Sequence, residues 1–199
     1  YLNTGWIGRY LDYACDNCKH PTQTLEIESM LSLAMKGEKN KSLTFTDPQR
    51  LYETANEKYF KSVYESHNHD NETVEYLYKT LGDTINNAGY IYENAKAKQS
   101  TETYPDTQIG KDLKTIASLI KSDINTNIYY LTIGSFDTHI NQLERQTQLF
   151  TQINDAVKAL VNDLKINHLF ENTLLMTFSE FGRRVAQNAS NGTDHGTAN

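Results

Sequence analysis

The chain has 199 residues, a formal net charge of −6 and 38% hydrophobic residues. This length is sufficient for one domain with a hydrophobic core. The acidic balance argues against a nucleic-acid partner, because binding phosphates needs clustered Lys and Arg, and no apolar run approaches the ~20 residues that span a bilayer. A small anionic substrate is compatible with the charge, since a bound divalent cation would dominate the local field.

The first part of the chain contains one short helix and one ambiguous segment. Residues 5–11 form a short amphipathic pattern that indicates a helix. Residues 24–36 begin with strand-like alternation at Leu25 and Ile27 and continue with helical spacing. A further helix is predicted from Asp47 and Pro48 to about residue 65, because Asp caps free amides and Pro suits the first helical position.

The remaining elements predict an α/β fold with a parallel-rich sheet and flanking helices. Helices are expected over residues 72–98 and 109–120, so residues 48–122 form a helical layer or insertion. A strand over 128–133, a helix over about 141–167 and a strand over 173–178 fit a right-handed crossover between parallel strands. We therefore predict a single domain over 1–199, with the site in its strand–helix–strand part, 128–199.

Two small clusters near the N-terminus have several interpretations. Cys15 and Cys18, followed by His20, could form half of a zinc site, a redox pair, a local disulfide or two ordinary thiols. His67 and His69 lie in a polar loop, where such a pair most often has no ligand.

The strongest candidates for chemistry follow the predicted strands. Asp137 and His139 lie just beyond the first strand. Side chains two residues apart on extended backbone point the same way, so both can reach one cation. A carboxylate with an imidazole suits zinc, manganese or iron. The alternative is that Asp137 caps the next helix and His139 packs.

Further candidates follow in the last third of the chain. Asp194 and His195 are adjacent, so on a strand they would diverge, and a shared ion requires a turn, for which Gly192 and Gly196 are suited. Glu180 could act as a ligand or a base. Either Arg183 or Arg184 could bind a phosphate or sulfate, or form a surface ion pair. His168, at a helix end, is interpreted as structural.

Four motifs in order resemble one known family. They are residues 5–12 (GWIGRYLD), 134–139 with Gln142 (GSFDTH), 179–184 (SEFGRR) and 192–196 (GTDHG). Together they resemble domain-of-unknown-function family 1501. That family is similar to the alkaline phosphatase, sulfatase and cofactor-independent phosphoglycerate mutase superfamily, and many members carry twin-arginine export signals. The resemblance implies an exported or periplasmic protein with an alkaline phosphatase-like fold.

The superfamily resemblance also implies a two-metal site. Asp137 and His139 match the ligands of one ion, and Asp194 and His195 match the ligands of the other. The expected cofactors are divalent ions such as zinc, manganese or calcium. Two features depart from the superfamily, because its Asp and His are spaced more widely, and Glu180 stands where its Asp–His pair usually lies.

The resemblance implies an enzyme, with one alternative. The expected function is metal-dependent hydrolysis of small phosphate or sulfate esters, with Arg183 gripping the anionic oxygens and Glu180 contributing to catalysis. The alternative is a non-catalytic binding or scaffold protein of the cell envelope that retains the fold. The chain begins at Tyr1 and stops soon after a Gly-rich motif. We therefore expect a fragment whose N-terminal nucleophile and first Asp ligand lie outside it.

Overall fold

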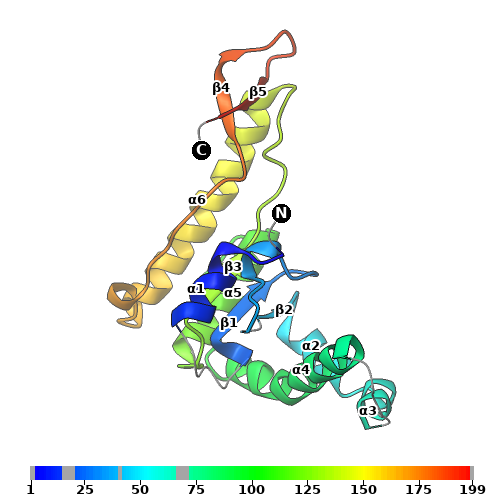
Figure 1. Ribbon diagram of the computed structural model, residues 1–199. Coiled ribbons are helices and arrows are strands. Elements are labelled where there is room, and N and C mark those ends of the chain that lie inside the picture. The colour runs from blue at the N-terminus through cyan, green and yellow to red at the C-terminus, as the bar shows by residue number, and fades with distance from the viewer. Residues whose placement is uncertain (1–2, 15–20, 40–41, 66–71, 198–199) are drawn as a thin grey trace. The chain divides into compact units, whose positions relative to one another are not determined.

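Figure 1 shows the computed structural model, which describes residues 3–14, 21–39, 42–65 and 72–197. The chain forms two compact units. Unit 1 contains residues 1–99 and 118–132, and unit 2 contains residues 100–117 and 133–199. Cys15, Cys18, His20, His67 and His69 lie outside the described residues.

Unit 1 is built on a three-stranded parallel sheet, which confirms the α/β class with a parallel sheet. The central strand β1 (Thr24–Ile27) lies between β2 (Leu43–Phe45) and β3 (Ile128–Leu131). Leu25 is in register with Leu43 on one side and Tyr129 on the other. All four residues of β1 are buried, as expected of a strand with parallel neighbours on both edges. The ambiguous segment 24–36 thus begins as a strand.

Helix α1 (Trp6–Ala14) packs its apolar residues on this sheet. Ile7 and Leu11 form a buried cluster with Met35, against which Ile128 and Tyr130 of β3 also pack. Met35 belongs to the 3-10 helix η2 (Leu33–Met35), and a second 3-10 helix, η1 (Pro21–Gln23), precedes β1.

The middle of the chain is helical in its described parts, as predicted. It contains α2 (Pro48–Ala55), α3 (Lys58–Glu65) and α4 (Glu72–Ala97), followed by α5 (Gln108–Lys121), in which the boundary between the units falls. Asp47 caps α2 by accepting a hydrogen bond from the Arg50 amide at 2.8 Å. The single helix expected to residue 65 was wrong, because α2 ends at Asn56, whose side-chain amide donates to the Tyr52 carbonyl at 2.8 Å.

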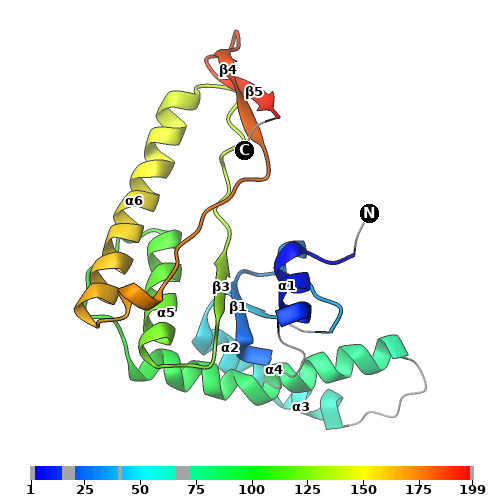
Figure 2. The ribbon, with the colours of Figure 1, turned by 60° about the vertical axis from the view of Figure 1, so that its left-hand side comes forward.

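Unit 2 contains a long helix and a β-hairpin (Figures 1 and 2). Helix α6 (Gln142–Ile166) has the predicted extent and is followed by η3 (Phe170–Asn172). Strand β4 (Gly182–Gln187) pairs antiparallel with β5 (Thr193–Gly196). The buried face of α6 includes Ala156, Leu160 and Leu164, and its buried Asp163 accepts a hydrogen bond from the Tyr104 hydroxyl at 3.2 Å.

The predicted strand over 173–178 is absent from the structure. Residues 173–179 have no regular secondary structure, and four apolar side chains, Leu174, Leu175, Met176 and Phe178, are exposed. Apolar, β-prone composition does not form a strand unless a neighbouring strand satisfies its backbone groups. Within the described residues, this segment is not part of either sheet.

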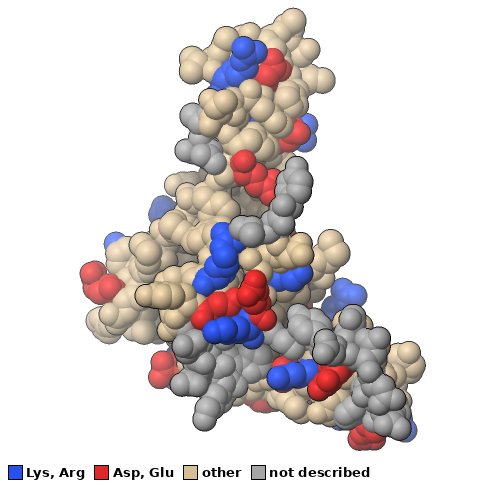
Figure 3. Space-filling model, viewed as in Figure 1, with Lys and Arg blue, Asp and Glu red and all other residues tan. Residues whose placement is uncertain are grey.

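Two further observations concern the predictions about a nucleic-acid partner and about membrane-spanning segments. On the face shown in Figure 3, Lys and Arg side chains are interspersed with Asp and Glu. Among the described residues, no helix combines the length and apolar character needed to cross a membrane.

Two helical glycines differ in their surroundings and therefore predict opposite effects on stability. A Cβ at Gly8 in α1 would overlap the backbone of Lys36 and Gly37, whereas a Cβ at Gly89 in α4 would meet only the Tyr52 ring, at 3.8 Å. Gly8→Ala should reduce the free energy of unfolding by about 1–3 kcal/mol. Gly89→Ala should raise it by up to about 1 kcal/mol, because Ala favours a helix. Urea denaturation checks both, and a stabilising Gly8→Ala would contradict the close packing of α1.

Glu26 in β1 predicts a pH-dependent stability. Its side chain is fully buried, one carboxylate oxygen accepts from the Ser32 amide at 2.9 Å, and the other has no partner among the described residues. Burial raises the pKa of this carboxyl above 4.5. The folded protein therefore keeps a proton that the unfolded chain releases, and stability falls as the pH rises from the ordinary pKa through the folded one.

Glu26→Gln removes this dependence. At pH 7 the variant should be more stable than the parent chain by about 1–3 kcal/mol, because a neutral carboxamide avoids the cost of burying an ionisable carboxyl. Unfolding followed between pH 4 and pH 8 tests this, with Glu57→Gln, an exposed carboxylate, as the control. The interpretation fails if the two variants have the same pH profile.

Candidate metal centre

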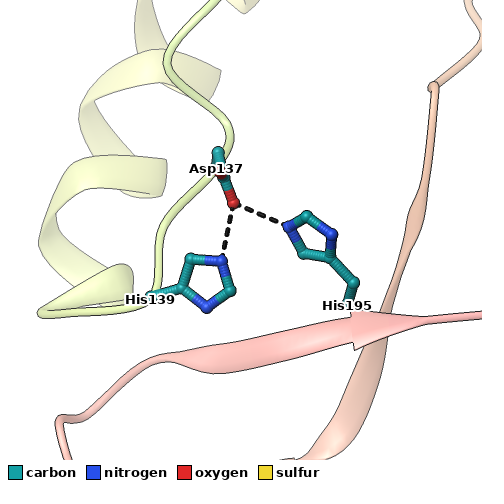
Figure 4. Close-up of side chains that lie close together, drawn as sticks. All are labelled: Asp137, His139 and His195. Carbon is teal, nitrogen blue, oxygen red and sulfur yellow. Dashed lines mark hydrogen bonds and ion pairs between the residues drawn. The ribbon is translucent and has the colours of Figure 1, made fainter.

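The irregular segment that follows β3 brings Asp137 and His139 together. The two side chains lie on the same side of the backbone, and Asp137 Oδ1 is 2.9 Å from His139 Nε2 (Figure 4). The spacing predicted that the two side chains share a face, although Asp137 lies in a tight turn in which the Thr138 amide donates to the Phe136 carbonyl at 2.9 Å.

Strand β5 adds His195 to this pair, although His195 is 58 residues from Asp137 in sequence. His195 Nε2 lies 2.8 Å from Asp137 Oδ1 (Figure 4). The ligand atoms of Asp137, His139 and His195 all lie within 4.8 Å of one another. We call these three residues the Asp–His–His cluster. One carboxylate and two imidazoles thus face a common point.

Aromatic contacts orient the imidazole of His195. Its ring stacks on the Phe181 ring at a centroid distance of 3.9 Å, and its centroid is 5.0 Å from that of His139. The side chains of the cluster are 44–60% exposed. The cluster is therefore open to solvent on one side and bounded by aromatic rings on another.

Arg183 joins the two segments that carry the cluster. Its Nη2 donates to the Phe136 carbonyl at 2.7 Å, and its Nη1 donates to the carbonyls of Thr193 at 2.6 Å and Thr138 at 3.2 Å. Its Nη2 also lies 3.3 Å from Asp137 Oδ1, and only 15% of its side chain is exposed. A planar guanidinium with several fixed donors can hold two backbone segments at once.

The turn of the hairpin forms a second attachment to the same segment. Asn188 donates to the His139 carbonyl at 3.1 Å, and its carbonyl oxygen accepts the amide of Gly192 at 3.0 Å. A Cβ at Gly192 would overlap the His139 carbonyl. Glycine is therefore needed here for close approach, while Asn191 adopts the left-handed conformation of the turn, with φ 57°.

Asp194 and His195 diverge because they are neighbours on a strand. The Asp194 carboxylate lies 3.6 Å from Nδ1 of His139, the nitrogen that does not face Asp137. Asp194 is not among the three residues whose ligand atoms cluster. The structure thus brings together Asp137, His139 and His195 and places Asp194 behind His139.

The electrostatics of the cluster favour an ionised Asp137. Its pKa lies below the usual range, chiefly because of the hydrogen bond with His195, with further lowering by the nearby His139 and Arg183. An ionised carboxylate can only accept, so His195 Nε2 is the donor of its hydrogen bond with Asp137.

The other predicted residues lie outside the cluster. Glu180 is exposed in the segment before β4. Arg184 is also exposed, with Nη1 3.9 Å from Asp194 Oδ2. His168 follows the end of α6 with φ 57°, and its amide donates to the Lys165 carbonyl at 3.1 Å, which fits a structural role.

Sequence reasoning missed the supporting residues. Phe181 and Asn188 were not predicted to have a role, and the buried Thr138, which accepts from Gln146 at 3.1 Å, was not considered. Their roles depend on the hairpin formed by β4 and β5, which has a weak sequence signal because β4 is largely exposed and lacks apolar alternation.

Replacing Arg183 should release the hairpin from the segment that carries Asp137. Arg183→Lys leaves one nitrogen, which cannot reproduce the bonds to both segments, while Arg184→Lys alters an exposed side chain and is the control. The amides of Asn141 and Gln142, which donate to Ser190 and Asn191, report this docking. Their hydrogen exchange should quicken roughly tenfold or more in Arg183→Lys only. Equal exchange in the two variants would contradict the role of Arg183.

Comparison with known protein families places this chain in a family. Residues 92–199 match the family model described as a protein of unknown function, DUF1501. The matched range includes every residue of the cluster and its supports from Phe136 to His195. Searches of curated proteins and of solved structures gave no match. Because the family model covers more than half of the 199 residues, the chain belongs to the DUF1501 family.

Proposed function

We propose that the Asp–His–His cluster binds one divalent transition-metal ion and that the protein is a metal-dependent hydrolase of phosphate or sulfate esters. The observation that carries the proposal is the convergence of one carboxylate and two imidazoles, with ligand atoms within 4.8 Å, from segments far apart in sequence.

The donor set fits such an ion. Imidazole nitrogen with carboxylate oxygen suits zinc, manganese or iron, whereas calcium prefers oxygen ligands alone. Calcium is therefore the least suited of the ions expected. Three protein ligands leave a coordination position open, as in catalytic rather than structural zinc sites. The exposure of the cluster side chains gives a small substrate access to that position.

Binding an ion through Nε2 would require both imidazoles to carry their hydrogen on Nδ1. Nε2 of each histidine faces the Asp137 carboxylate, and a nitrogen that ligates a metal cannot carry a hydrogen. His139 would then carry its proton on Nδ1, which faces the Asp194 carboxylate at 3.6 Å. We assign Asp194 as the outer carboxylate that orients His139, an arrangement common around histidine ligands.

The remaining roles in the proposed reaction fall to Arg183, Arg184 and Glu180. When bound, a divalent ion would polarise the ester oxygens and activate a nucleophile. Arg183 is assigned a positioning role, because its terminal nitrogens already bond the carbonyls of Phe136, Thr138 and Thr193. Arg184 is exposed beside Asp194 and is the candidate to bind the anionic oxygens of a substrate, and Glu180 stays the candidate acid or base.

We also propose that the chain is related to the alkaline phosphatase and sulfatase superfamily and is exported, as its motifs suggest. A parallel sheet whose strand β3 leads into Asp137 and His139 supports this relation. The arrangement differs from the superfamily pattern in one respect. His195 joins Asp137 and His139 at a single point, so the proposal here is one ion instead of two.

A non-catalytic cell-envelope binding or scaffold protein is the second candidate. It is favoured by the contacts of Asp137 Oδ1, which already pairs with both imidazoles and with Arg183. Such a network satisfies its own charges without an ion, and it could serve to hold the hairpin in place. A measurement of ester hydrolysis distinguishes this candidate from the hydrolase, because only the hydrolase converts substrate.

Zinc titration of the chain by calorimetry tests the metal site. His195→Ala should abolish measurable binding, since it removes one of three ligands, and Asp194→Asn should weaken it about 10–100-fold, as loss of an outer partner does. His168→Asn, which tolerates the left-handed conformation, removes an imidazole elsewhere and should have no effect.

Two further outcomes test the metal site and the catalytic activity in turn. Unchanged zinc affinity in His195→Ala would contradict the site itself. Zinc binding with the expected pattern, but without hydrolysis of p-nitrophenyl phosphate or p-nitrophenyl sulfate by the full-length protein, would favour the non-catalytic candidate.

A further inference from the structure

A groove in unit 2 differs in chemistry from the metal centre. It has a volume of about 730 Å³ and is formed by the first half of α6 together with β4, β5 and the turn between them. Its size is typical of small-molecule sites, which span about 300–1,000 Å³. Side chains that line it include Gln142, Gln146, Thr147, Phe150, Asn154 and Gln187.

The polar lining of the groove is uncharged. None of the described residues that line it is an Asp, Glu, Lys, Arg or His. Carboxamides and hydroxyls both donate and accept hydrogen bonds, so they match ligands that do the same at many positions. The start of α6 does not offer a free anion site, because the Gln142 amide already donates to the Asn191 carbonyl at 2.9 Å. A charged ligand would therefore lose its hydration without a counter-charge.

Phe150 supplies an apolar surface among these polar groups. Its side chain is 57% exposed, and its ring packs edge-to-face against Phe136 at a centroid distance of 5.4 Å. This contact limits the rotation of the ring. A fixed aromatic surface beside carboxamides suits a ligand with C–H faces and equatorial hydroxyls.

Parts of the lining are held in place before any ligand binds. Gln146 donates to the buried Thr138 hydroxyl at 3.1 Å, and Gln187 donates to Asn191 at 3.3 Å. The carboxamide of Gln142 has no hydrogen-bond partner in the described part of the chain, so it is available to a ligand. Ordered donors reduce the entropy that a ligand must overcome on binding.

We infer that this groove binds a neutral saccharide, with Phe150 against a sugar face and Gln142 and Gln187 bonding its hydroxyls. This inference does not depend on the proposed hydrolase or on the metal. An uncharged peptide is the other ligand class with mixed donors and acceptors. It is less well matched, because its backbone offers no flat C–H face to pack on the exposed Phe150 ring.

Titration of the ¹⁵N-labelled chain, followed by NMR in the presence of a metal chelator, tests the inference. The probes are maltose, cellobiose and diacetylchitobiose, with glucose 6-phosphate as the charged counterpart and a Gly-Ser-Asn peptide as the peptide probe. At least one disaccharide should shift the side-chain amide signals of Gln142 and Gln187. Glucose 6-phosphate and the peptide should bind more weakly.

Variants locate the binding site. Phe150→Ala should weaken disaccharide binding about tenfold, the effect of losing one aromatic contact. Phe150→Leu, which keeps apolar volume beside Phe136, should weaken it to a similar extent. Gln152→Ala, an exposed residue of α6 outside the groove, is the control and should leave binding unchanged.

Three results would overturn the inference. They are no shift with any disaccharide up to about 10 mM, tighter binding of the peptide or the phosphate, and equal disaccharide affinity in Phe150→Leu and Gln152→Ala.

Discussion

The candidate site depends on the guanidinium of Arg183, whose side chain is only 15% exposed. It donates to carbonyls on both sides of the cluster, those of Phe136 and Thr138 in one segment and that of Thr193 in β5. Buried carbonyl groups need partners, and one side chain that satisfies several of them fixes the spacing of the backbones that carry them. His195 can face Asp137 because this bridge holds β5 beside the segment that follows β3. The hairpin turn reinforces the bridge where Gly192 approaches His139.

Much of the fold could be predicted from local patterns. The apolar periodicity of α6 gave its extent, and the Asp47–Pro48 pair gave the start of α2. The strand at 173–178 was wrong because composition alone cannot supply a pairing partner. Strand β2 was missed because it has only three residues, and β4 was missed because it is largely exposed and lacks the apolar alternation that marks a strand.

Local sequence patterns predicted part of the site, and the part that depends on strand pairing could not be predicted from them. The spacing of Asp137 and His139 implied that they share a face, and the adjacency of Asp194 and His195 implied that they diverge; both follow from backbone geometry. Which of the latter two joins Asp137 depends on the register of β5 against β4, where Arg183 is paired with His195. Local sequence does not encode that register. The use of Arg183 as a bridge also depends on it.

X-ray absorption spectroscopy of the chain with one equivalent of zinc tests the central claim most directly, because it counts the imidazoles bound to the ion. The cluster predicts two histidine ligands and one carboxylate, with bond lengths of about 2.0–2.2 Å. His139→Ala lacks one of the three ligands, so its zinc should stay in solution and show oxygen ligands alone. Oxygen ligands alone around zinc in the unchanged chain, or two imidazoles per zinc in His139→Ala, would contradict the account.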